Sequence, residues 1–176
     1  MNRFTLFLAI ALALAAGDAL AQSHQPYAGF EARSIKALSD QQIADLRGGR
    51  GLSLALAAEL NGYPGPMHTL ELADSLGLSA EQRARVQSLF AAMKAEAIPL
   101  GEKLIAQEAE LDRAFVHQTI TAAQLQAATE AIGSTQAALR QVHLKYHLVT
   151  RDILTPEQLR QYAALRGYAG HQHGRQ

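Results

Sequence analysis

Cysteine is missing from this chain of 176 residues. The fold therefore cannot depend on disulfide bonds, even in a compartment that would permit them. A net charge of either sign is missing too, because 16 Lys and Arg residues balance 16 Asp and Glu residues. Nucleic-acid binding needs a basic surface, so this balance argues against a nucleic-acid partner. Stability must come from apolar helix faces that are buried against one another.

No hydrophobic run beyond residue 21 is long enough to cross a membrane. The apolar run over residues 4–16 follows Arg3 and is itself too short to span a bilayer comfortably. Ala19 and Ala21 then occupy the two positions that a signal peptidase inspects. We therefore expect a cleaved signal peptide over residues 1–21, a periplasmic location, and no membrane span after cleavage. An uncleaved anchor is the alternative.

The rest of the chain has a length suited to one domain with its own core. Joints rich in Gly and Pro divide it, and the stretches between them are rich in Ala, Leu, Gln and Glu, which favour helix over strand. The expected segments are a flexible leader over residues 22–37, short helices and a Gly/Pro-rich loop over residues 38–66, a helical domain over residues 67–168, and a disordered tail over residues 169–176.

A five-residue pattern stands at four of the expected helix starts, over residues 38–42, 78–82, 120–124 and 154–158. Each copy has an aliphatic residue, a hydroxyl residue, two spacers and Gln. The hydroxyl can accept a hydrogen bond from the third helical N–H, while the Gln side chain accepts one from the N–H of the cap residue. In the copies at residues 78–82 and 154–158, the helix-capping residues are Leu78, Ser79, Gln82, Leu154, Thr155 and Gln158.

Two long helices are predicted to follow, over about residues 79–118 and 121–153. Apolar residues recur in the second helix at steps of three and four, with Thr135 as the only clearly polar member of the stripe. Since the turn between the helices is very short, they must form an antiparallel hairpin. Pro99 removes a backbone hydrogen bond inside the first helix, which predicts a bend there.

These features together resemble the Spy/CpxP family of small periplasmic proteins, which carry a repeated Leu-Thr-x-x-Gln motif. Residues 154–158 match the motif fully, and residues 78–82 match it with Ser79 in place of Thr. The resemblance covers roughly residues 66–166, and residues 27–66 have no counterpart in it. It implies an all-α fold, with a long bent antiparallel helical hairpin flanked by shorter helices, in a cradle-like homodimer.

The resemblance implies two kinds of function. Our first hypothesis is an ATP-independent chaperone-like protein of the envelope stress response, which binds unfolded or partly folded periplasmic proteins. The alternative is a periplasmic sensor or resistance protein that binds a heavy metal such as zinc, copper or nickel. The chain departs from the chaperones of the family because it lacks a strong positive charge.

The sequence does not predict an enzyme or a required cofactor. Residues 51–55, Gly-Leu-Ser-Leu-Ala, resemble a nucleophile elbow only superficially, because the second Gly and the preceding strand are missing. Residues 48–51 lack the Gly-Lys-Ser/Thr that would make a phosphate-binding loop.

His143 and His147 are the candidate metal ligands. They lie four residues apart, hence on one face of the second long helix. Pairing the hairpin residues about its turn places Glu96 opposite His143, and Met93 opposite His147. A carboxylate and a thioether beside two imidazoles would suit zinc, copper or nickel. Alternatively, the two histidines only flank the apolar stripe.

Overall fold

The computed structural model describes residues 26–168. The chain divides into two compact units, Met1–Glu31 and Ala32–Gln176. In the described part of the first unit, the Phe30 N–H donates to the Tyr27 carbonyl oxygen at 3.0 Å. The expected signal peptide over residues 1–21 and the expected tail over residues 169–176 lie outside the described residues, so both stay predictions.

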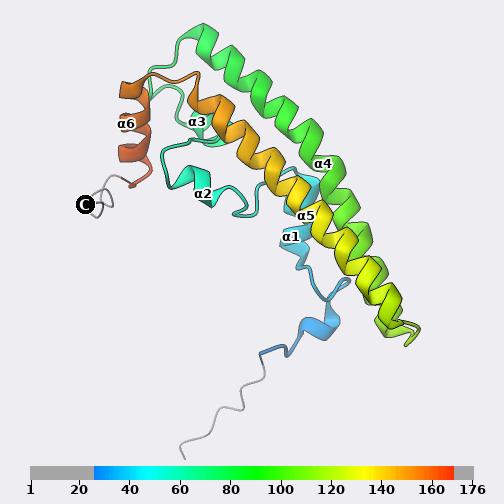
Figure 1. The fold of residues 1–176 in the computed structure, drawn as a ribbon. Coiled ribbons are helices and arrows are strands. Elements are labelled where there is room, and N and C mark those ends of the chain that lie inside the picture. The colour runs from blue at the N-terminus through cyan, green and yellow to red at the C-terminus, as the bar shows by residue number, and fades with distance from the viewer. Residues whose placement is uncertain (1–25, 169–176) are drawn as a thin grey trace, which may run out of the picture. The chain divides into compact units, whose positions relative to one another are not determined.

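The described residues form helices and no strand, which confirms the predicted all-α fold (Figure 1). A short 3-10 helix, η1, spans Phe30–Ala32. The α-helices are α1 (Asp40–Arg47), α2 (Leu56–Glu59), α3 (Pro66–Glu71), α4 (Ala80–Val116), α5 (Ala122–Arg151) and α6 (Pro156–Leu165). None of the described helices combines the length and the apolar character that crossing a membrane would take.

Helices α4 and α5 lie side by side as the predicted hairpin (Figure 1). The chain reverses direction at Gln118, whose φ of 54° lies in the left-handed region. The long helix is bent, as predicted, and Pro99 lies within it. The shorter helices flank the hairpin. A dimer stays a prediction.

All four predicted capping boxes are present. Ser39, Ser79, Thr121 and Thr155 each accept a hydrogen bond from the N–H of the Gln three residues later, and the Gln side chain accepts one from the cap residue's N–H. The pattern in the sequence therefore predicted the start of α1, α4, α5 and α6 to the residue.

Two of the capping glutamines also bond to each other, which the sequence did not indicate. The Gln82 side chain donates to Gln158 Oε1 at 2.8 Å, and the Gln158 side chain donates to Gln82 Oε1 at 3.0 Å. Gln82 donates further to the Ile153 carbonyl at 2.9 Å. These hydrogen bonds connect the start of α4 to the start of α6. They hold the start of α6 next to the end of the hairpin that lies opposite the turn.

The buried face of α5 differs from the predicted stripe towards the C-terminal end of the helix. The spacing of three and four predicts Val149 in the stripe, but Val149 is exposed, whereas His143, His147 and Thr150 are buried. The cause is that α2 and α3 pack on α5 and cover this side of it (Figure 1). Thr135 is buried as predicted, and its hydroxyl donates to the Ala131 carbonyl, so its burial leaves no unsatisfied donor.

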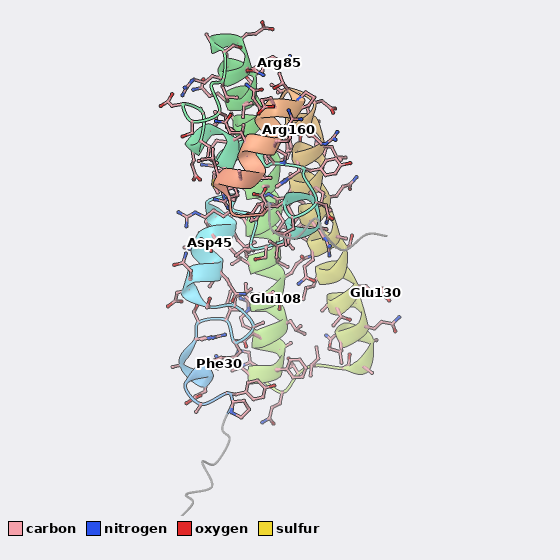
Figure 2. The ribbon with its side chains drawn as sticks, turned by 90° about the vertical axis from the view of Figure 1, so that its left-hand side faces the viewer. Phe30, Asp45, Arg85, Glu108, Glu130 and Arg160 are labelled. Atoms are coloured by element: carbon pink, nitrogen blue, oxygen red, sulfur yellow. The ribbon has the colours of Figure 1, made fainter. Side chains whose placement is uncertain are left out.

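Helix α1 packs closely on α4, and Figure 2, in which Asp45 labels α1 and Glu108 labels α4, shows the two side by side. Gly101 of α4 makes this approach possible. A Cβ at Gly101 would lie 2.6 Å from the Leu46 carbonyl oxygen, which is closer than atoms can pack. Ile35, from the expected flexible leader, is buried in the same core.

We expect the two helical glycines of the hairpin to respond oppositely to alanine. Gly133→Ala meets no atom within 4 Å and should stabilise the protein by about 0.5–1 kcal/mol, because alanine favours helix. Gly101→Ala should destabilise it by about 1–3 kcal/mol, since α1 must move away from α4. Urea unfolding followed by circular dichroism measures both. A Gly101→Ala protein as stable as Gly133→Ala would contradict the close packing of α1.

Candidate functional site

A cavity of about 610 Å³ lies between the chain over residues 45–68 and the long helices. Polar and sulfur-containing side chains contribute much of its lining. They are Asp45, Arg50, Ser53, Glu59, Met67, His68, Met93, Lys94, His143 and His147. Both predicted histidines thus face one cavity, together with the predicted Met93, and a third histidine joins them from α3.

His143 is almost completely buried, with 2% of its surface exposed. Its Nε2 atom is buried and has no hydrogen-bond partner among the described residues. Burial lowers the pKa of His143, and the nearby His147 lowers it further. The ring is therefore neutral at physiological pH, and a neutral imidazole has a lone pair that can bind a metal ion. A ligand would satisfy a ring that the protein leaves incompletely paired.

His147 is held in a defined orientation. Its Nδ1 lies 2.6 Å from the Tyr63 carbonyl oxygen. A carbonyl oxygen only accepts, so Nδ1 carries the proton in this contact and Nε2 keeps the lone pair. A Cβ at Gly65 would lie 2.7 Å from His147 Nε2, so only glycine at this position leaves room for the ring.

Glu59 is a buried carboxylate at the end of α2, with 6% of its surface exposed. It accepts hydrogen bonds from the Gly65 N–H at 3.2 Å and from the Tyr162 hydroxyl of α6. Burial raises the pKa of Glu59, but the contacts with His68 and Tyr162 and the charges of His68 and His147 outweigh it, so the pKa lies below its ordinary value. The carboxylate is therefore ionised inside the protein.

Glu96 lies opposite this part of α5, as the pairing about the turn predicted, but it serves other partners. Its carboxylate accepts from Lys145 Nζ at 2.6 and 2.8 Å and from the Tyr146 hydroxyl at 2.7 Å. These hydrogen bonds lower the pKa of Glu96. In the described part of the chain, no three His, Cys, Asp or Glu side chains are grouped so that they could hold a metal ion as they stand. The predicted set of His143, His147 and Glu96 is therefore not preassembled.

The cavity is bordered by a strained loop. Leu52 and Ser53 have φ angles of 43° and 64°, in the left-handed region that residues with side chains rarely adopt. Such strain persists only where surrounding structure enforces it, and it concentrates at functional sites. This conformation could not be predicted from the sequence, because neither residue is glycine or asparagine.

The hydroxyl of Tyr162 should contribute measurably to stability. Tyr162→Phe removes the donor to the buried Glu59 carboxylate and should lower the free energy of unfolding by about 1–3 kcal/mol. Tyr168→Phe is the matched control, because its hydroxyl is 3.4 Å from the same oxygen, and we expect a much smaller loss. Equal unfolding curves for the two variants would show that Tyr162 does not satisfy Glu59.

Comparison with known proteins gave one finding. A family model described as heavy-metal resistance matches residues 51–161, which include Glu59, His68, His143 and His147. No curated protein and no solved structure matches the chain.

Proposed function

The chain belongs to the heavy-metal resistance family, and from this membership we propose that it binds a transition-metal ion in the periplasm as part of resistance to that metal. The family lies within the Spy/CpxP-like superfamily, so the predicted resemblance holds at that level. The periplasmic location rests on the expected signal peptide over residues 1–21. The family match favours the metal-binding alternative over the chaperone hypothesis as the first candidate.

The observation that carries this proposal is the burial of two imidazoles, His143 and His147, side by side on α5 and facing one cavity. Within residues 26–168, His143 Nε2 has no hydrogen-bond partner, and His147 keeps a lone pair on Nε2. Imidazole nitrogen suits zinc, copper and nickel, and a thioether from Met93 adds a softer donor. A bound ion would supply positive charge that satisfies these lone pairs; no catalytic step is required.

Metal titration tests the proposal directly. We expect the full chain to bind zinc, copper or nickel in isothermal titration calorimetry, and the His143→Gln/His147→Gln variant to lose this binding. Glutamine fills much of the imidazole volume but is a poor ligand for these ions. Every protein in the series carries His171→Ser and His173→Ser, so that the histidines near the C-terminus add no heat of their own.

His117→Gln is the matched control, since His117 is exposed at the C-terminal end of α4 and does not line the cavity. It should bind metal as the parent does. The proposal is wrong if the parent binds none of the three ions, or if the double variant and the parent give the same dissociation constant.

Exposed apolar side chains favour a chaperone-like activity as the second candidate. Phe115 and Val116, at the turn of the hairpin, are 53% and 60% exposed. Apolar groups held in water at a helix end can contact the apolar segments of an unfolding protein. Such binding is weak and needs no nucleotide, which agrees with our hypothesis of an ATP-independent chaperone for unfolded periplasmic proteins.

Light scattering by a heat-stressed substrate protein tests this second candidate. Stoichiometric amounts of the chain, without ATP, should reduce aggregation, and Phe115→Ser/Val116→Ser should reduce it less. Leu148→Ser/Val149→Ser removes exposed apolar groups from the other long helix, α5, and serves as control. No suppression by the parent at several-fold excess, or equal suppression by both double variants, counts against the hairpin turn as the client-binding surface.

A further inference from the structure

Residues 49–65 form a covering segment over the part of α5 that carries His143 and His147. Helix α2 is the middle of this segment and packs on α5 (Figure 1). Glycine makes the closest approaches: a Cβ at Gly51 would lie 3.4 Å from His143 Nδ1, and a Cβ at Gly65 would lie 2.7 Å from His147 Nε2. The burial of the two rings therefore depends on where this segment lies.

The covering segment buries few large apolar side chains. Leu56 and Leu60 are 48% and 56% exposed, and the other two leucines of the segment are only partly buried. Its buried side chains are those of two alanines, Pro64 and Glu59. The cavity of about 610 Å³ lies between the segment and the long helices, where tight packing would otherwise add contacts. Since stabilisation grows with buried apolar area, this segment is held less firmly than α4 is held on α5.

The backbone of the covering segment contains both strained and flexible positions. Leu52 and Ser53 hold left-handed φ angles of 43° and 64° against the preference of residues with side chains. Movement of the segment away from the hairpin releases this strain. Gly49 and Gly62 have φ angles of 66° and 83° near the two ends of the segment. Glycine adopts many backbone conformations, so both positions can act as hinges.

Polar contacts hold the covering segment in place. The Tyr63 carbonyl oxygen accepts from His147 Nδ1 at 2.6 Å, and Glu59 accepts from the Tyr162 hydroxyl of α6. Water can replace both contacts, because a carbonyl and an ionised carboxylate are well hydrated. Opening of the segment therefore has a smaller free-energy cost than separation of the apolar faces of α4 and α5.

We propose that the covering segment is a lid that moves about Gly49 and Gly62 and gives water access to His143 and His147. The hairpin of α4 and α5 stays intact during this movement. In the closed lid, His143 Nε2 has no hydrogen-bond partner within residues 26–168, and water supplies one when the lid opens. The inference goes beyond the proposed function, because it concerns access to the two rings in the protein without metal.

Modification of histidine by diethyl pyrocarbonate tests the lid, because this reagent acylates imidazole nitrogens that solvent reaches. The full chain is treated at neutral pH with a metal chelator, and mass spectrometry follows each histidine. Trypsin cleaves after Lys145, which lies between His143 and His147, so the two are measured in separate peptides. His117 is exposed and serves as the reference in the same molecule.

We expect His143 to react more slowly than His117, but at least about tenfold faster than global unfolding allows. The slowest backbone amides of α4 and α5 in hydrogen exchange give the free energy of global unfolding. Low concentrations of urea should leave the His143 rate nearly unchanged, since a local opening exposes little surface. A His143 rate that matches global unfolding, or that rises with urea as steeply, overturns the inference.

Two substitutions of the exposed, strained Ser53 show whether the opening occurs at this segment. Asparagine adopts left-handed φ angles readily, and a β-branched residue rarely does. Ser53→Asn should therefore slow the modification of His143, and Ser53→Val should accelerate it, with a difference of about fivefold between the two. Ser75→Val is the matched control and should leave the rate unchanged, because Ser75 is exposed and has no left-handed φ.

The two measurements exclude different alternatives. The urea dependence excludes access through global unfolding, and the Ser53 variants exclude access through an opening elsewhere in the chain. Equal His143 rates in Ser53→Asn and Ser53→Val overturn the lid. Neither result depends on whether the cavity binds an ion, so failure of the lid and failure of the proposed function are separate outcomes.

Discussion

The burial of the Glu59 carboxylate is the constraint around which the cavity is organised. An ionised carboxylate inside a protein destabilises it unless hydrogen bonds and positive charge surround it. The Gly65 N–H, the Tyr162 hydroxyl and the Arg166 guanidinium, 3.7 Å away, meet this requirement. These partners come from the loop before α3, from α6, and from the residue that follows α6. The position of one charge thus connects three segments of the chain.

The hairpin supplies the frame on which this arrangement depends. Apolar burial between α4 and α5 holds the two long helices together, and the reciprocal bonds between Gln82 and Gln158 set where α6 begins. With that start fixed, Tyr162 lies one turn along α6 from Gln158 and reaches Glu59. The same helix pair presents His143 and His147 to the cavity. The capping motif therefore does more than start helices. Through the Gln82–Gln158 bonds and the Tyr162–Glu59 bond, it also helps to position the candidate site.

The sequence predicted the parts of the fold that local rules govern. Four capping boxes, two long amphipathic helices and a short turn all follow from spacing, and the structure has them. The burial of His143 and His147 could not be predicted. The segment that covers them contains the short helices α2 and α3, and its sequence has no helical periodicity of apolar residues. Glu59 gave no signal either, since its partner Tyr162 is 103 residues away. Pairing about the turn found the right neighbourhood for Glu96, but Lys145 and Tyr146 compete for its carboxylate at the surface.

The contact between His147 and Tyr63 bears on the proposed metal binding. Nδ1 of His147 carries its proton in this contact with the Tyr63 carbonyl oxygen. An ion of the proposed kind would therefore bind at Nε2 and leave the hydrogen bond in place. Such a bond orients an imidazole and makes it a better ligand. The loop that contains Tyr63 thus prepares the orientation in which His147 would act.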